Sequence, residues 1–238
     1  MERIGQKDNF IAKHAKIATV VAVIFGSTSG ILGNLITAPA LAIGFWRLAI
    51  ALPFFIIPAV ADREKRHKLK GISKKDYILC FISGAFLFGH YFSWFNAVKL
   101  TNVASASVLA ALHPLVVLLV TVFVYRRKVS LRSVLAIIVA LLGGVLIMGA
   151  DYSTFAGGNI TGNIFAFFAA VFMGLYFAMG DEVRKRVDGG LYVLLVFASC
   201  WICFIIGNIA SGTELLGYRP MDYVYLIVMA FVCRSEER

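Results

Sequence analysis

The sequence predicts an all-α protein, a polytopic bundle of membrane-spanning helices, and two observations carry this prediction. First, 60% of the 238 residues are hydrophobic, 15% are charged and the mean hydropathy is +0.84, values outside the range of soluble globular domains. Second, seven apolar runs are each about as long as the roughly 20-residue helix that crosses a hydrocarbon core. These runs are 17–36, 41–60, 77–98, 103–125, 134–150, 161–180 and 191–210.

Each run is continuously apolar, so each is expected to be a helix, because backbone polar groups must find partners away from water. The first run follows a basic segment, as in a signal peptide, but six more runs follow it and we interpret it as a retained helix. An eighth run, 221–233, has only 13 residues before a charged tail. It predicts either a thin terminal helix or a chain that is incomplete at its C-terminus, and we favour incompleteness.

Positive charge alternates between the loops. Segments 1–16, 61–76, 125–133 and 181–190 and the C-terminal tail hold 20 of the 23 Lys and Arg residues, whereas the intervening loops hold two. Because cytoplasmic loops retain Lys and Arg, we expect the N-terminus and the basic loops in the cytoplasm. The same loops account for the net charge of +10, so we expect the lipid bilayer as a partner and no nucleic acid.

The sequence lacks the residue patterns of the common catalytic sites. It contains no phosphate-cradling Gly-Lys-Ser/Thr motif, no metal-ligand spacing and no Ser/His/Asp arrangement, so neither an enzyme nor a metal or cofactor site is expected. Cys200 and Cys203 have the spacing of a redox pair, but they lie within a span, where a thiolate is poorly solvated.

Several short segments resemble the EamA family of the drug/metabolite transporter superfamily. They are Phe-Gly-Ser at 25–27, Phe-Trp-Arg-Leu-Ala at 45–49, Ala-Ala-Leu-His-Pro-Leu at 110–115, Leu-Leu-Gly-Gly-Val-Leu-Ile at 141–147 and Gly-Asn at 162–163. The resemblance implies two inverted five-helix repeats, an arrangement that agrees with the opposite directions of the first and sixth spans. We expect residues 1–156 to form the first repeat, with five transmembrane helices, and 157–238 to form an incomplete second repeat of two to three helices.

Arg47 is the only Lys or Arg deep within a span, where a charge costs roughly 2.5–3.5 kcal/mol at the helix centre. One interpretation makes it the anchor for an anionic substrate in an outward-opening cavity. The alternative is that its side chain extends outward and bonds helix-end carbonyls or Asn34.

His90 and His113 fall near the middle of consecutive spans, where they could relay protons or form buried hydrogen bonds to neighbouring polar groups. Pro114 frees a backbone carbonyl one turn earlier, which predicts a kinked helix beside a cavity. Asn34 and Asn96 lie on or beside stripes of small and polar residues on the first and third spans. These stripes could line a polar path or pack helices together.

The favoured function is a multi-pass carrier that moves a small metabolite by alternating access, with export as the favoured direction and an ion or substrate gradient as the driving force. Its candidate substrate-binding residues are Arg47, Asn34, His90, Asn96 and His113. The resemblance implies the bacterial inner membrane. The alternative is a non-transporting membrane component or an inactive fragment of such a carrier, and the sequence leaves a homodimer open.

Overall fold

The computed structural model describes residues 28–149 and 159–236, and the prediction of an all-α bundle is confirmed, since these ranges contain helices and no strand. Residues 28–35 are helical. The helices that follow are α2 (Ala40–Ala51), α3 (Pro53–Ala61), α4 (Arg63–Lys70), α5 (Lys74–Leu100), α6 (Val103–Ala110), α7 (His113–Leu119), the π-helical η1 (Val120–Val124), α8 (Leu131–Gly149), α10 (Ile160–Val183), α11 (Gly189–Ser211) and α12 (Pro220–Glu236).

The apolar runs coincide with these helices. Within the described residues, five helical stretches are long and apolar enough to cross a membrane, namely Ala40–Ala61, Lys74–Leu100, Val103–Val124, Ile160–Val183 and Gly189–Ser211. The first predicted span begins outside the described residues and ends at the helix over 28–35. The eighth run forms α12, which has 17 residues because it starts before the apolar run and continues past it.

Polar caps explain where several helices begin. The side chains of Asp62, Ser73, Asn102, Asn159 and Asp188 each accept a hydrogen bond from a backbone N–H in the first turn of the helix that follows, at 2.7–3.3 Å. Such caps satisfy donors that have no partner within the helix. Loops that lie between apolar runs therefore stop one span and start the next.

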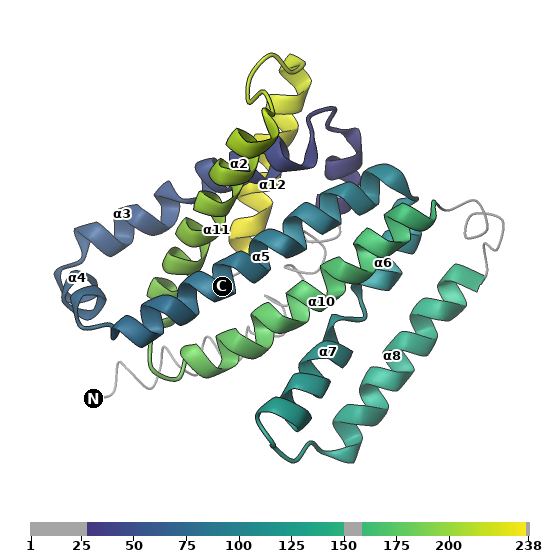
Figure 1. The fold of residues 1–238 in the computed structure, drawn as a ribbon, viewed down its shortest axis with the longest axis horizontal. Coiled ribbons are helices and arrows are strands. Elements are labelled where there is room, and N and C mark those ends of the chain that lie inside the picture. Colours follow the sequence, from purple (N-terminus) through teal and green to yellow (C-terminus); the bar gives the residue numbers. More distant parts are fainter. Residues whose placement is uncertain (1–27, 150–158, 237–238) are drawn as a thin grey trace, which may run out of the picture.

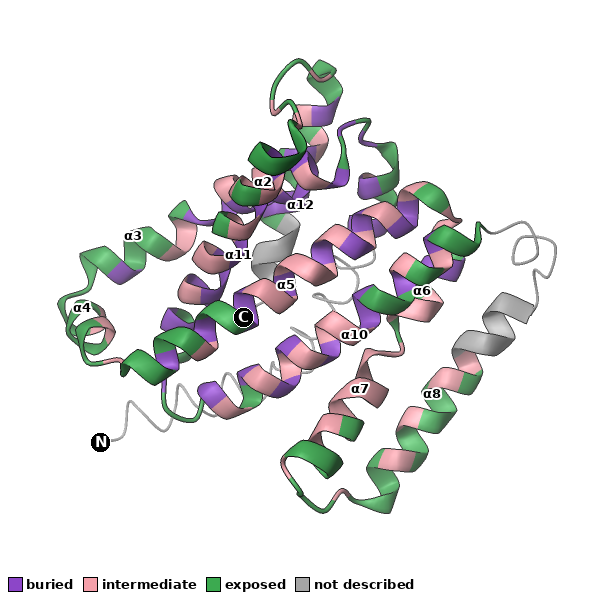
Figure 2. Cartoon of the chain, in the orientation of Figure 1, coloured by how far each residue is buried: buried purple, intermediate pink, exposed green. Residues whose placement is uncertain are grey.

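Two long helices, α5 and α10, lie side by side in the middle of the bundle (Figure 1). Helices α2, α3, α11 and α12 lie on one flank, where α11 contacts both α2 and α5. Helices α6, α7 and α8 lie on the other flank, where α6 and α7 contact α10. Buried residues concentrate on α2, α5, α10 and α11, whereas the described part of α8 is largely exposed (Figure 2). We expect a bilayer to cover its exposed apolar side chains.

The contact between α5 and α11 requires glycine at position 84. A Cβ added to Gly84 would lie 2.5 Å from Cβ of Ser199 and 2.7 Å from the carbonyl oxygen of Val196. We expect Gly84→Ala to lower the free energy of unfolding by about 1–3 kcal/mol, because backbone cannot move aside cheaply. The matched control is Gly143→Ala on α8, where an added Cβ meets no atom within 4 Å. In detergent, Gly84→Ala should unfold at a lower temperature than Gly143→Ala. Equal melting temperatures would contradict the close packing of α5 against α11.

The two cations in the charge-poor loops bond the end of the first described helix. Lys99 Nζ donates to the carbonyl of Ile36 at 2.7 Å, and Arg219 Nη2 donates to the carbonyl of Leu35 at 3.5 Å. Carbonyls at a helix C-terminus attract positive charge. These exceptions to the charge alternation therefore have local partners in the structure.

Candidate functional site

The guanidinium of Arg47 lies inside the bundle, where α2, α5 and the helix over 28–35 meet. Its residue is only 2% exposed. Nη1 donates to Oγ of Ser29 at 3.2 Å, and Cζ lies 4.3 Å from the ring centroid of Tyr91 and 5.9 Å from that of Phe95. A desolvated cation over an aromatic ring gains about 2 kcal/mol. In this conformation the side chain points inward and does not extend to the membrane surface.

Aromatic packing fixes α2 in this position. Phe45 stacks on Trp201 of α11, with ring centroids 5.6 Å apart. Trp46 Nε1 donates to the carbonyl of Leu215 at 2.8 Å, in the loop after α11. Neighbouring residues of α2 thus hold the helix from two sides, and Arg47 is presented toward α5.

His90 and Asn96 are both half-buried on α5 and bond to different helices. Nδ1 of His90 donates to the carbonyl of Ala169 on α10 at 2.9 Å, so this ring joins the two central helices. Nδ2 of Asn96 donates to the carbonyl of Phe92, one turn earlier in its own helix, at 2.8 Å. His90 adjoins Tyr91 in sequence and Asn96 adjoins Phe95, so each of these candidates neighbours a ring that lies close to Arg47.

The fourth predicted span is broken at His113. Helix α6 ends at Ala110, and α7 begins at His113, directly before Pro114. Nδ1 of His113 donates to the carbonyl of Ala110 at 3.1 Å. That is the carbonyl four residues before Pro114, which proline leaves without a helical N–H partner. The histidine therefore satisfies a group that the proline frees.

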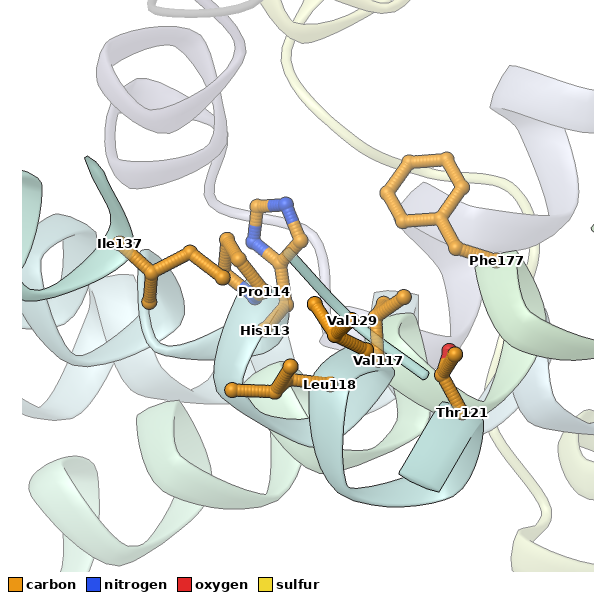
Figure 3. A pocket seen from close by; sticks show the side chains of 8 residues that line it. All are labelled: His113, Pro114, Val117, Leu118, Thr121, Val129, Ile137 and Phe177. Atoms are coloured by element: carbon orange, nitrogen blue, oxygen red, sulfur yellow. The ribbon is translucent and has the colours of Figure 1, made fainter. Parts of the chain in front are cut away.

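A cavity of about 390 Å³ opens beside this break, between α7, α8 and α10 (Figure 3). Its lining is mainly apolar and includes His113, Val117, Leu118, Thr121, Val129 and Phe177. The volume lies within the range of small-molecule sites. Nδ1 of His90 and Nδ1 of His113 bond different carbonyls, and the structure shows no hydrogen bond between the two rings among the residues that it describes.

Asn34 is exposed near the end of the first described helix and lies apart from the buried contacts of Arg47 that the structure shows. On the same helix, a Cβ added to Gly30 would lie 3.1 Å from the ring of Trp94. The small-residue stripe therefore packs this helix against α5 at Gly30. The stripe on the first span also contains Ser27, at helical spacing from Gly30 and Asn34, and Ser27 lies outside the described residues.

One end of the bundle carries a network of ion pairs that joins the basic turns. Arg127, after η1, lies 3.2 Å from Asp181 and 2.6 Å from Glu182 at the end of α10. Arg186, in the next turn, lies 3.0 Å from Asp76 at the start of α5. The predicted convergence of the basic loops at one end agrees with these contacts. The exposed pairs of Arg127 contribute only about 0–1 kcal/mol each. Asp76 is only 8% exposed, so its pair with Arg186 is half-buried and costs more to open.

Tyr125 completes the connection between η1 and α10. Its hydroxyl donates to the carbonyl of Ala178 at 3.2 Å, and its ring lies 5.3 Å from the guanidinium carbon of Arg127.

Sequence reasoning missed a buried carboxylate at the opposite end. Asp222 on α12 has 0% exposure and accepts hydrogen bonds from the backbone N–H and the hydroxyl of Thr37. Arg219 lies 3.5 Å away. Asp222 is the second residue of the short eighth run. A carboxylate beside an apolar segment was the one feature of the sequence that could have indicated a buried charge there. Within the described ranges, no three His, Cys, Asp or Glu side chains are grouped to hold a metal ion.

Comparisons with known proteins agree with this architecture. The uncharacterized transporter YxxF of Bacillus subtilis (strain 168) is 30% identical over 186 residues, which make up 76% of this chain and 59% of that protein. The chain thus spans about three fifths of the length of this relative. A crystal structure of a protein with 19% identity aligns with a TM-score of 0.68 over 94% of this chain and 79% of that chain, which shows a shared fold.

A family model describes more than half of the sequence. The model of the EamA-like transporter family matches residues 15–149, which include Arg47, His90 and His113. Together with the membrane-length helices, this match identifies a multi-pass membrane protein. The chain belongs to the EamA-like transporter family.

Proposed function

We propose that the chain acts as a carrier that moves a small anionic metabolite across the membrane by alternating access. The observation that carries the proposal is the guanidinium of Arg47, held at 2% exposure between Ser29 and Tyr91. Arginine stays charged in proteins, so the centre of this bundle keeps a permanent positive charge with planar hydrogen-bond donors. A carboxylate or phosphate group matches those donors in charge and geometry.

Two further features support a carrier. The break between Ala110 and His113 makes the span over 103–124 discontinuous, and discontinuous helices form the binding sites of many secondary transporters. The ion pairs of Arg127 and Arg186 close one end of the bundle. The pairs of Arg127 are exposed and cost little to separate, and the half-buried pair of Arg186 with Asp76 holds this end more firmly. Rocking of the helices around the central charge would expose Arg47 to one side at a time.

Of the other candidates, His90 lies beside this centre and His113 lines the neighbouring cavity, whereas Asn34 and Asn96 would contribute in another conformation of the cycle.

The proposal includes a direction and a place. We infer export from the cytoplasm through the cell's inner membrane, driven by an ion or substrate gradient, with the basic loops on the cytoplasmic side. The two expected repeats, 1–156 and 157–238, would then lie in opposite orientations around the centre.

Secretion of metabolites by bacterial cells that express the full chain tests this function. We expect one or more carboxylate- or phosphate-bearing metabolites to accumulate in the medium relative to cells with an empty vector. Arg47→Ala should reduce this accumulation by roughly 30-fold or more, because removing one partner of a desolvated charge contact costs about 2–5 kcal/mol. Arg47→Lys keeps the positive charge but lacks the planar donors, so its metabolite accumulation should lie between those of Arg47→Ala and the unchanged chain.

Arg132→Ala provides the matched control, since Arg132 is an exposed arginine in the first turn of α8. When both proteins are equally abundant in the membrane, cells with Arg132→Ala should secrete as much metabolite as cells with the unchanged chain. Unchanged secretion by Arg47→Ala would remove Arg47 from the site. If no metabolite distinguishes the expressed chain from the empty vector, the chain is a non-transporting membrane component.

A further inference from the structure

A groove lies between α8 and the segment formed by α7 and η1, and it reaches from the break at His113 to the basic turn after η1. It combines the cavity of about 390 Å³ that starts at His113 with a second hollow of about 710 Å³ that reaches Arg126 and Lys128. Leu118 and Val129 line both hollows, so the two lie next to one another. The inner hollow, shown in Figure 3, is mainly apolar, and the outer hollow ends in three consecutive cations.

The three cations differ in their partners. Arg127 pairs with Asp181 and Glu182 of α10. Arg126 and Lys128 are exposed and make no ion pair with a carboxylate among the residues that the structure describes. Two cations at the mouth of an apolar groove are therefore available to an anion.

The backbone supplies an independent observation. Arg126 has a φ of 51°, in the left-handed region, just after the end of the π-helical η1. Glycine is the usual residue at such a position after a helix, because other side chains are strained there. The sequence places a cation at this strained position, at the rim of the groove.

We propose that this groove binds an anionic phospholipid of the bilayer, with one acyl chain in the apolar hollow beside His113 and the headgroup phosphate between Arg126 and Lys128. The apolar walls formed by Leu118, Val122 and Val129 match hydrocarbon. The two cations match the phosphate, and basic pockets between transmembrane helices are typical sites for anionic headgroups. The lipid proposal does not depend on Arg47, which carries the transport proposal, but its inner hollow is the cavity that His113 lines.

Charge complementarity favours a lipid over a helix from another chain. An apolar helix seated in the groove would bring Arg126 and Lys128 against its end, and it would need acidic residues there to offset them. A phospholipid meets both requirements with one molecule, and the groove lies open to the surface that the bilayer covers. The exposed side chains of Leu119 and Phe123, at 51% and 73%, extend that surface beside the groove.

Native mass spectrometry of the full chain in detergent tests the proposal with phosphatidylglycerol and phosphatidylcholine of identical acyl chains. We expect the unchanged chain to retain phosphatidylglycerol preferentially, and inorganic phosphate to leave that complex intact. The double variant Arg126→Gln and Lys128→Gln should weaken phosphatidylglycerol binding roughly 30-fold, from about fivefold per cation. Val117→Trp, which fills the apolar hollow and keeps both cations, should also abolish the complex.

The matched control is the double variant Arg63→Gln and Arg66→Gln, which removes two exposed cations from α4 at the same end of the bundle. It should bind phosphatidylglycerol as the unchanged chain does. If Val117→Trp does not give a monodisperse protein, Ile137→Trp fills the same hollow from α8. Equal retention of both lipids, equal weakening by the control, or full binding by the filled variants would overturn the proposal. Loss of a dimer in the filled variants would assign the groove to a second copy.

Discussion

A cysteine at position 70 and a cysteine at position 214 should react with a membrane-impermeant maleimide from opposite sides of the membrane. In intact cells, Glu214→Cys should be labelled and Lys70→Cys should not, and inverted vesicles should reverse this result. Both residues are exposed, Lys70 at the end of α4 and Glu214 in the loop after α11. The expected effect is close to all or none, because lipid and the ion-paired end of the bundle separate the two positions.

Both variants would be made in a chain whose four native cysteines are replaced by alanine. Labelling after the membrane is permeabilised provides the control, since both sites should then react. Lys70 is expected to face the cytoplasm. Its segment, 61–76, contains seven of the 20 Lys and Arg residues that the basic segments hold. If both cysteines react from one side, the proposed topology is wrong. If the two sides are exchanged, the bundle is correct and its orientation is reversed.

The helices could be predicted closely because a bilayer imposes one length and one pattern on every span. Helix α4 shows what this pattern omits. Its segment was treated as a loop because it has few apolar residues, yet Asp62 caps it and Glu64 pairs with Lys68 at 2.7 Å. An acidic start and a basic end are the signals of a helix terminus, and they were present in the sequence.

Arg47 could be singled out from the sequence because a charge within an apolar run is costly and conspicuous. Its contacts could not, since Ser29 and Tyr91 come from other helices and one sequence does not determine which faces meet. Asn96 illustrates the opposite outcome. It occupies a polar stripe, but its amide bonds the carbonyl of Phe92 in its own helix, as buried polar groups often do.

Pro114 shows how local chemistry can be predicted in part. The sequence indicated a kink and a freed carbonyl one turn earlier, and α6 and α7 are indeed separate helices. The partner of that carbonyl, His113, depends on the rotamer of a single ring and is visible only in the structure. The sequence therefore locates the break, whereas the packing determines which side chain bonds the freed carbonyl of Ala110.

The second large effect is expected at Ser29, the partner of Arg47. Ser29 is 5% exposed and Cys200 is 0% exposed, so both positions are buried in this conformation. Alternating access requires the Arg47 centre to meet water during the cycle, whereas Cys200 of α11 belongs to the hydrophobic core and is expected to stay there. In membranes, Ser29→Cys should therefore react with a small impermeant methanethiosulfonate, and a chain that retains only Cys200 should not.

This accessibility of Ser29→Cys tests the central claim most directly, because it asks whether the charged centre opens at all. The proposed carrier predicts modification of Ser29→Cys within minutes, from the side that is open, at a rate between those of Glu214→Cys and Cys200. A Ser29→Cys chain that stays as unreactive as Cys200, while Glu214→Cys reacts fully in the same membranes, would contradict alternating access around Arg47.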